Sequence, residues 1–180
     1  MTIDRNSIES LFRKQGFEDF KWIEPREIVV AQWVRMKCTY GCGGYAKHSA
    51  CPPNVPGVEE CRTFFSEYTH AVVFHFAQAF ANPEDRKEWC QGLNIELLKV
   101  EREVFLAGHR KAFLLFPGGC AFCGECAGTR VDCRNSKLIR PTPEALAMDV
   151  YATVWKYGLP VQVLTDYHQT MNRYAFLMIE

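Results

Sequence analysis

Apolar residues recur along the chain with two different periods, and these periods predict a mixed α/β fold. Residues 70–77 (HAVVFHFA) and 111–116 (KAFLLF) are short runs of branched and aromatic residues, as is typical of buried strands. The segment between them carries an apolar stripe with helical spacing, formed by Trp89, Leu93, Leu97, Val100 and Val104. Asn82 as a cap and Pro83 as the first helical residue predict the start of this helix, which should run to about residue 108. A helix between two strands predicts a β-α-β unit over residues 70–116, with its strands parallel.

The remaining elements are expected to complete one mixed sheet with helices packed on it. Apolar spacing and end signals predict helices over residues 6–14, 58–68 and 143–157. Branched and aromatic runs predict a strand over 26–38 and a C-terminal hairpin made of 160–165 and 174–180. Nothing resembling a linker interrupts the sequence. We therefore expect residues 1–180 to form a single α/β metal-binding domain, with cysteine clusters on loops at strand ends.

The charge balance excludes some classes of partner. Lysine plus arginine number 21, as do aspartate plus glutamate, so no net basic field attracts nucleic acid or anionic lipid. The first residues show no signal peptide, and no apolar run approaches the roughly 18 to 20 residues of a membrane helix. We expect a cytoplasmic protein that binds neither nucleic acid nor membrane.

Nine cysteines are the most informative feature of the composition. In a reducing compartment they are expected to stay free thiols, and an odd number cannot pair completely within one chain. Cysteines 38, 42, 51 and 61 form a first group; 120, 123, 126 and 133 form a second. Cys90 stands apart within the predicted long helix and is interpreted as a packing residue. Such grouping favours metal binding.

The second group has the spacing C-x2-C-x2-C followed by a fourth cysteine, and it predicts an iron–sulfur cluster. Cys120, Cys123 and Cys126 suit three corners of a cubane, and Cys133 suits the fourth. Structural zinc is more often held by two separated C-x2-C pairs, which makes a third cysteine at the same step redundant. Basic residues follow the motif and would offset the cluster's negative charge: Arg130, Arg134, Lys137 and Arg140.

The first group, in the stretch CTYGCGGYAKHSACPP, predicts ligands of a second site. In bacterial ferredoxins the cysteine before a proline ligates the other cluster of a pair, and here that cysteine is Cys51. Two schemes follow. In the local scheme Cys38, Cys42 and Cys51 share one site; in the exchanged scheme Cys51 and Cys133 trade places.

The fourth ligand of the first site is open between two residues. Cys61 is one candidate, although it falls on the apolar face of a predicted helix and suits a buried core thiol equally well. His48 is the other, in a loop rich in glycine. If neither residue coordinates, three thiolates leave one iron open to a substrate.

The cysteine motifs, together with GGCAFCGECAG, CRNS and RPTPEALAMDV, resemble a family of bacterial and archaeal predicted metal-binding proteins of unknown function. The resemblance covers nearly the whole chain. It implies that seven cysteines are the functional positions: Cys38, Cys42, Cys51, Cys120, Cys123, Cys126 and Cys133.

Three functions are compatible with these motifs. The first is a protein with one or two [4Fe-4S] clusters that transfers electrons for a partner enzyme. The second is a small enzyme in which an open iron of a three-cysteine cluster polarises a substrate. The third is a structural zinc protein. The sequence identifies neither the partner, nor the substrate, nor the oligomeric state.

Overall fold

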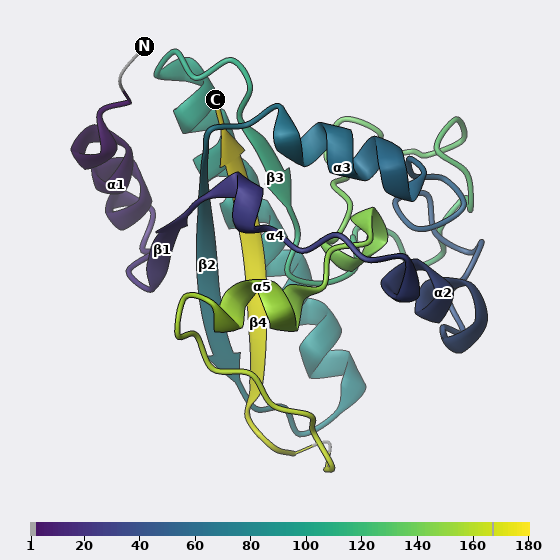
Figure 1. Ribbon diagram of the computed structural model, residues 1–180. Coiled ribbons are helices and arrows are strands. Elements are labelled where there is room, and N and C mark those ends of the chain that lie inside the picture. Colours follow the sequence, from purple (N-terminus) through teal and green to yellow (C-terminus); the bar gives the residue numbers. More distant parts are fainter. Residues whose placement is uncertain (1–2, 167) are drawn as a thin grey trace.

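A four-stranded sheet in the order β1-β2-β4-β3 forms the centre of the computed structural model, which describes residues 3–166 and 168–180 (Figure 1). The strands are β1 (Phe20–Ile23), β2 (His70–Gln78), β3 (Phe113–Leu115) and β4 (Met171–Ile179). Every hydrogen-bonded pair is antiparallel, and β2 pairs with β4 from His70 opposite Ile179 to Gln78 opposite Met171. The expected α/β class is confirmed.

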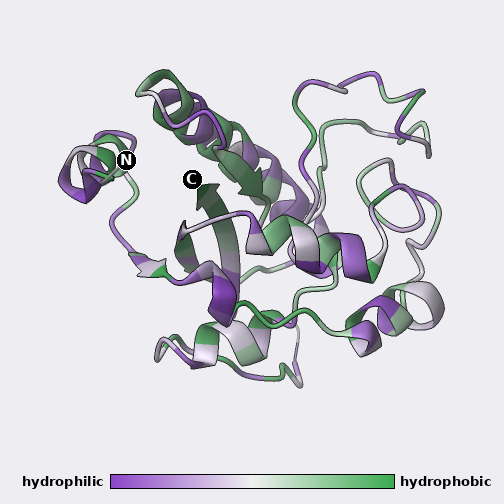
Figure 2. Ribbon diagram, turned by 45° about the horizontal axis from the view of Figure 1, so that its top comes forward, coloured by the Kyte–Doolittle hydropathy of each residue, from purple (hydrophilic) through white to green (hydrophobic). Residues whose placement is uncertain are grey.

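Alternate side chains of the strands enter two separate cores. Ala71 and Val73 of β2 face a core shared with α3 (Val58–Ser66) and α5 (Val150–Trp155). Val72 and Phe74 face the other core, shared with α1 (Arg5–Lys14) and α4 (Pro83–Leu106). Because both faces are covered, the central strands are apolar on both sides. Figure 2 shows these strands as largely hydrophobic.

The helices with clear end signals form where the sequence predicts them. Asn82 caps α4, with its Oδ1 accepting from the Asp85 amide at 2.9 Å, and Pro83 is the first helical residue. Leu97, Val100 and Val104 of the predicted stripe are fully buried against the sheet. Helices α1 and α3 likewise begin and end within two residues of the predicted bounds.

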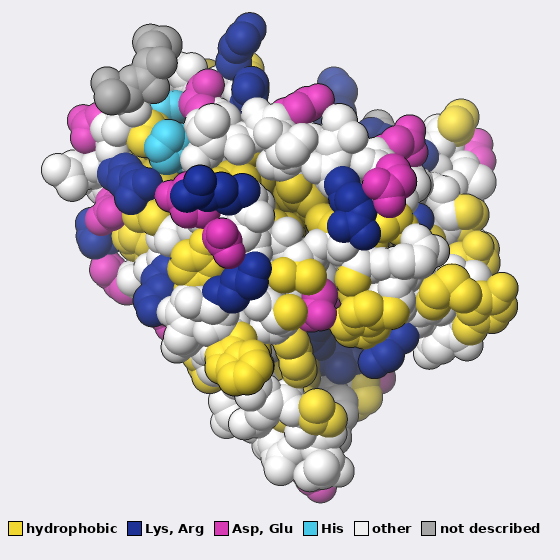
Figure 3. Space-filling model, in the orientation of Figure 1, with side chains coloured by type: hydrophobic (Ala, Val, Ile, Leu, Met, Phe, Trp, Pro, Cys, Tyr) yellow, Lys and Arg dark blue, Asp and Glu magenta, His cyan; other side chains and the backbone are white. Residues whose placement is uncertain are grey.

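The predicted strand over 26–38 is wrong. A short 3-10 helix, η1 (Pro25–Glu27), and a single bridge between Val30 and Met148 precede the helix α2 (Gln32–Gly41), which carries Cys38 in its last turn. The apolar residues of α2 suggested a buried strand, but most of them lie outside the core. Val34 is buried, whereas Trp33, Met36 and Tyr40 are 50%, 45% and 81% exposed. Figure 3 shows hydrophobic side chains gathered over α2.

The β-α-β prediction is correct in direction and incomplete in topology. β2 and β3 run parallel, as expected, but they are not neighbours, because β4 inserts between them and is antiparallel to both. The predicted C-terminal hairpin is absent from the described residues. Residues 160–165 form no strand there, and β4 takes its partners from β2 and β3 instead.

The predicted helix over 143–157 divides into two pieces. The 3-10 helix η2 (Glu144–Leu146) ends at Ala147, which has a left-handed φ of 59°. Asp149 then caps α5, with Oδ1 accepting from the Ala152 amide at 3.0 Å. Ala147 therefore ends one helix and the Asp149 cap begins the next, a local effect that apolar spacing does not reveal.

Two long connections lie on the β3 side of the sheet and carry six of the eight grouped cysteines, whereas Cys38 lies in α2 and Cys61 in α3 (Figure 1). The first, residues 42–57, joins α2 to α3; the second, residues 116–143, follows β3. The second group thus follows a strand, as predicted, whereas the first follows a helix. Among the described residues, none of the helices has the length and hydropathy needed to span a bilayer.

A buried ion pair secures the second connection to α4. Arg140 donates from Nε and Nη2 to the two carboxylate oxygens of Glu101 at 2.9 and 2.6 Å, and Glu101 also accepts from the Leu114 amide at 2.8 Å. Glu101 is 6% exposed, so its loss leaves a guanidinium and an amide without their acceptor in a poorly solvated place.

We expect Glu101→Ala to lower the free energy of unfolding by about 3 kcal/mol in urea denaturation followed by circular dichroism. Glu103→Ala, two residues along the same helix and more exposed, is the matched control and is expected to change it by less than about 0.5 kcal/mol. Equal losses in the two variants would contradict a special role for the Glu101 pair.

Candidate metal centre

Five of the seven predicted ligands line one cavity. The cavity, of about 570 Å³, lies between the two long connections and the start of α4. Its cysteines are Cys51, from the first connection, and Cys120, Cys123, Cys126 and Cys133, from the second, with Cys90 of α4 also on its wall. All five predicted ligands are half-buried, so solvent reaches the cavity while much of each thiol is covered.

α4 fixes the start of the second connection. The Asn94 side chain is completely buried and donates from Nδ2 to the carbonyl oxygens of Gly119 at 3.1 Å and Cys120 at 3.3 Å. Within the loop, Ala121 has a left-handed φ of 56° and Gly128 one of 84°. Non-glycine residues adopt this conformation at a cost of order 1 kcal/mol, and such residues concentrate at functional sites.

Hydrogen-bond donors point at the cysteine sulfurs. Ser49, which is 3% exposed, places its amide 3.4 Å and its hydroxyl 3.3 Å from Cys126 Sγ. Asn135 Nδ2 donates to Cys123 Sγ at 3.1 Å. Thiolates in metal centres accept such bonds, which hold the ligand in place and stabilise its negative charge.

The thiols differ in acidity. The Ser49 hydroxyl, helped by the Gly128 amide, lowers the pKa of Cys126 below its ordinary value. Burial, together with the nearby thiols of Cys38, Cys42, Cys126 and Cys120, raises the pKa of Cys51 to about 11. Burial also raises the pKa of Cys120, although the Phe122 amide opposes it.

The thiols that lie near Cys51 and near Cys120 show where the two cysteine groups approach each other. Cys51 lines the cavity with the second group, and the thiols of Cys38 and Cys42 in the first group also raise its pKa, so it lies between the groups. The thiols that act on Cys120 are Cys133, Cys123 and Cys126, the other members of its own sequence group. Cys38 lies against η2, with its Sγ 3.9 Å from the Glu144 carbonyl oxygen.

The two candidates for a fourth ligand lie in different places. Cys61 is fully buried in the core, with its thiol 3.6 Å from the Pro56 carbonyl oxygen, and it lines a separate cavity. His48 lines the thiol cavity near Cys42. A side chain added at Gly44 would meet both the His48 ring, at 3.2 Å, and Cys42 Sγ, at 3.5 Å. Glycine at this position therefore leaves room for the two side chains to approach.

Three residues of the site escaped the sequence analysis: Ser49, Asn94 and Asn135. Asn94 carried a usable signal, because an amide in line with the apolar stripe of α4 needs a buried partner. Ser49 acts across the two connections, and Asn135 acts within the second, twelve residues from Cys123. Nothing in their local sequence indicates these contacts. Of the four basic residues predicted near the cluster, Arg134 lines the cavity and lowers the pKa of Cys126 slightly.

The thiols surround a space and do not converge on one point. Within residues 3–166 and 168–180, no three side chains of histidine, cysteine, aspartate or glutamate lie together as ligands of a single metal ion. A cubane cluster has a different requirement, since each thiolate binds its own iron at a separate corner. A ring of thiols around a cavity fits that donor pattern.

Fold and site together define a cysteine-rich α/β protein with a thiol-lined cavity on the β3 side of its sheet. A family model described as "Predicted metal-binding protein (DUF2284)" matches residues 21–179, and the chain belongs to this family. Comparison with curated proteins and with solved structures finds no match. The family description agrees with a metal-binding role and leaves the kind of metal open.

The acidity of the thiols gives a test in metal-free, reduced protein. Only the thiolate is alkylated, so a thiol with a lowered pKa reacts at lower pH. We expect iodoacetamide to modify Cys126 much faster than Cys51 at pH 8, where a thiol of pKa about 11 is only about one-thousandth ionised. The rate at Cys126 should also level off at lower pH, as measured by mass spectrometry of digests.

Ser49→Ala is the matching variant, because it removes the hydroxyl that contributes most to the lowered pKa of Cys126. The pH profile of Cys126 should then move to higher pH while that of Cys51 stays in place. Identical profiles for Cys126 in both proteins would disprove the assigned role of the hydroxyl.

Proposed function

We propose that the cavity holds a [4Fe-4S] cluster on Cys120, Cys123, Cys126 and Cys133, and that the protein transfers electrons for a partner enzyme. The observation that carries this proposal is the presence of polar donors at the sulfur atoms in a thiol-lined cavity. When bound, such a cluster supplies one-electron redox chemistry.

The surrounding residues suit this role. Ser49 and Asn135 would keep their hydrogen bonds to two of the thiolates and so raise the reduction potential. Arg134 adds positive charge at the cavity wall. Because the thiols are half-buried, the centre would be shielded from bulk water and still lie close enough to the surface for electron exchange with a docked redox protein.

We assign the first cysteine group to a site of its own, the first site, as in the local scheme. Cys51 has its strongest interactions with Cys38 and Cys42, and Cys133 acts on Cys120, which favours each group keeping its own cysteines. In the exchanged scheme Cys51, which also lines the cavity, would take the place of Cys133.

The position of Cys61 favours one alternative function. With Cys61 in the core and lining another cavity, the first site would have three cysteines as ligands, with His48 beside Cys42. If His48 stays unligated, a cluster on these three thiolates would offer one iron as a Lewis acid to a substrate, which is enzyme chemistry.

Anaerobic purification, followed by assays of iron and acid-labile sulfide, tests the main proposal. We expect about four irons and four sulfides per chain for one cluster, or about eight of each for two. Dithionite reduction should give an electron paramagnetic resonance signal that disappears on reoxidation without loss of iron. A colourless protein that contains zinc and no sulfide would overturn the proposal in favour of structural zinc.

His48→Ala separates electron transfer from the open-iron alternative. If His48 is a ligand, the variant should lose iron or change the resonance signal of the first site. If it is not, iron content stays the same, and added citrate, a chelating hydroxy acid, should perturb that signal in the unmodified protein. If the iron content of His48→Ala is unchanged and citrate also leaves the resonance signal unchanged, an accessible open iron is excluded.

A further inference from the structure

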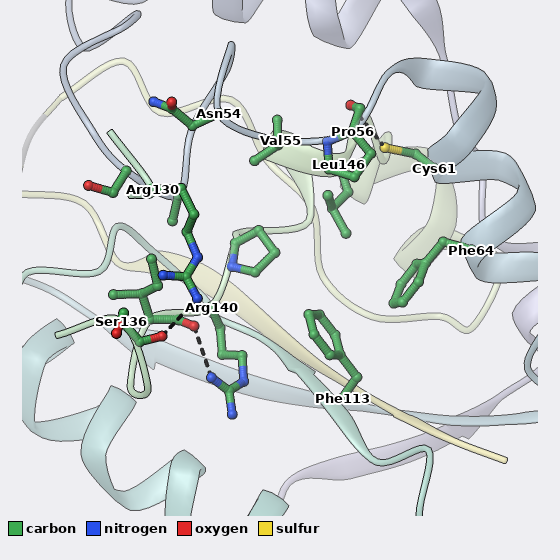
Figure 4. Close-up of a pocket in the computed structure, with 14 residues that line it drawn as sticks. Asn54, Val55, Pro56, Cys61, Phe64, Phe113, Arg130, Ser136, Arg140 and Leu146 are labelled. Carbon is green, nitrogen blue, oxygen red and sulfur yellow. Dashed lines mark hydrogen bonds between the residues drawn. The ribbon is translucent and has the colours of Figure 1, made fainter. Parts of the chain in front are cut away.

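A second cavity, of about 400 Å³, lies beside the thiol cavity and has a different lining. Its walls are mainly apolar, from Val55, Phe64, Phe113, Ile139 and Leu146. Figure 4 shows the guanidinium groups of Arg130 and Arg140 on one side of the cavity and Cys61 and Phe64 on the other. Sites for small organic molecules combine this range of volume with an apolar lining and a few polar groups.

One uncompensated positive charge lies at the polar side of this cavity. Arg140 is neutralised by its two-pronged ion pair with Glu101. Arg130 donates from Nη2 to the Ser136 carbonyl oxygen at 2.9 Å. In the part of the chain that the structure describes, no carboxylate lies within 4.0 Å of Arg130. Arg130 is exposed, and a guanidinium that lacks a counter-ion at the side of an apolar cavity favours an anionic group on the ligand.

From this geometry we propose that the cavity binds a small organic monoanion, a carboxylate with an aromatic body. The single free guanidinium matches one negative charge, and its fork matches the two oxygens of a carboxylate. The rings of Phe64 and Phe113, with centroids 5.3 Å apart, form an aromatic wall against which a further ring packs edge-to-face.

The position of this cavity places the ligand next to the thiols. Ser49, Ala50 and Ile139 line both cavities and form the wall between them. Ser49 is almost fully buried and hydrogen-bonded to Cys126 Sγ. If the proposed cluster is present, the ligand therefore lies one residue from a cluster thiolate. That closeness rests on the proposed function, whereas binding itself rests on the lining of the second cavity alone.

Calorimetric titration of the full chain with 3-phenylpropanoate tests the proposal, and 3-phenylpropanamide serves as the uncharged comparison. We expect the carboxylate to bind about tenfold more tightly than the amide, because only the carboxylate pairs with the charge of Arg130. No binding of the carboxylate, or equal binding of the two compounds, would refute the proposal.

Two variants and a control locate the binding. Arg130→Gln should weaken carboxylate binding about tenfold and leave amide binding unchanged, since only the charge is lost. Val55→Trp fills the cavity and should abolish binding of both. Arg110→Gln, an exposed arginine outside the lining, should change neither. Carboxylate binding insensitive to Arg130→Gln and Val55→Trp would place it elsewhere and overturn the proposal.

The same titration on metal-free protein keeps this test separate from that of the cluster. Because the lining includes none of the seven predicted cysteine ligands, the carboxylate is expected to bind with or without metal. Carboxylate binding by anaerobically purified protein that contains no iron would count against the cluster alone, and iron-containing protein that does not bind the carboxylate would count against the ligand site alone.

Discussion

Cys120→Ala is expected to remove most of the iron and sulfide of the second site, from about four irons to less than about one per chain. Cys120 begins the C-x2-C-x2-C motif, and its carbonyl oxygen is held by Asn94, so its thiol position is set by the fold. The loss of one corner ligand leaves an iron exposed to solvent and makes the cluster labile. Iron and sulfide assays on anaerobically purified protein measure the effect.

Cys90→Ala is the matched control for this variant. Cys90 lies on the wall of the same cavity, but it belongs to α4, is 8% exposed and packs near Gly118. We expect it to retain the full metal content. If Cys120→Ala also retained its iron, the motif would not be the binding site, and a loss in both variants would point to general damage to the cavity.

The second large effect that we expect is a difference in iron content between Cys51→Ala and Cys61→Ala. Cys51 interacts with thiols of both groups, whereas Cys61 contacts the Pro56 carbonyl oxygen in the core. Cys51→Ala should therefore lose the iron of one site. Cys61→Ala should keep all of it and lose about 1 kcal/mol of folding free energy, from the small core cavity that it creates.

Paired spectra of Cys51→Ala and Cys133→Ala distinguish the two ligand schemes. In the local scheme Cys133→Ala abolishes the same resonance signal as Cys120→Ala, and Cys51→Ala abolishes the other. In the exchanged scheme these assignments are reversed. Iron loss in Cys61→Ala equal to that in Cys51→Ala would show that Cys61 is a ligand and that the side chains rearrange when metal binds.

The parts of the fold that the sequence revealed are those encoded locally. The start of α4 depends on Asn82 and Pro83, which are adjacent, and the burial of β2 follows from its own apolar run. The strand order depends on pairing between β2 and β4, about a hundred residues apart, and no local pattern specifies it. The helix α2 was missed because Val34 and its aromatic residues, Trp33 and Tyr40, favour strands by propensity, a preference that tertiary context overrides.

The candidate site divides in the same way. The spacing of the second cysteine group is local, and the structure places its four members around one cavity. The contact of Ser49 with Cys126 joins two connections 77 residues apart, so it became visible only once both were placed. Cys61 shows the limit of grouping by sequence, since it is near Cys51 in the chain and its side chain lines a different cavity.

Helix α4 also determines the span of the second connection. Asn94 holds its first residues, and Glu101 holds Arg140 near its end. These two anchors are seven residues apart on one rigid helix, a separation of roughly 10 Å at 1.5 Å per residue. The two anchored ends of the second connection therefore stay at a constant distance from each other, whatever the connection encloses. Lengthening or shortening the connection between these two anchors should change how far it extends over the thiols without disturbing α4.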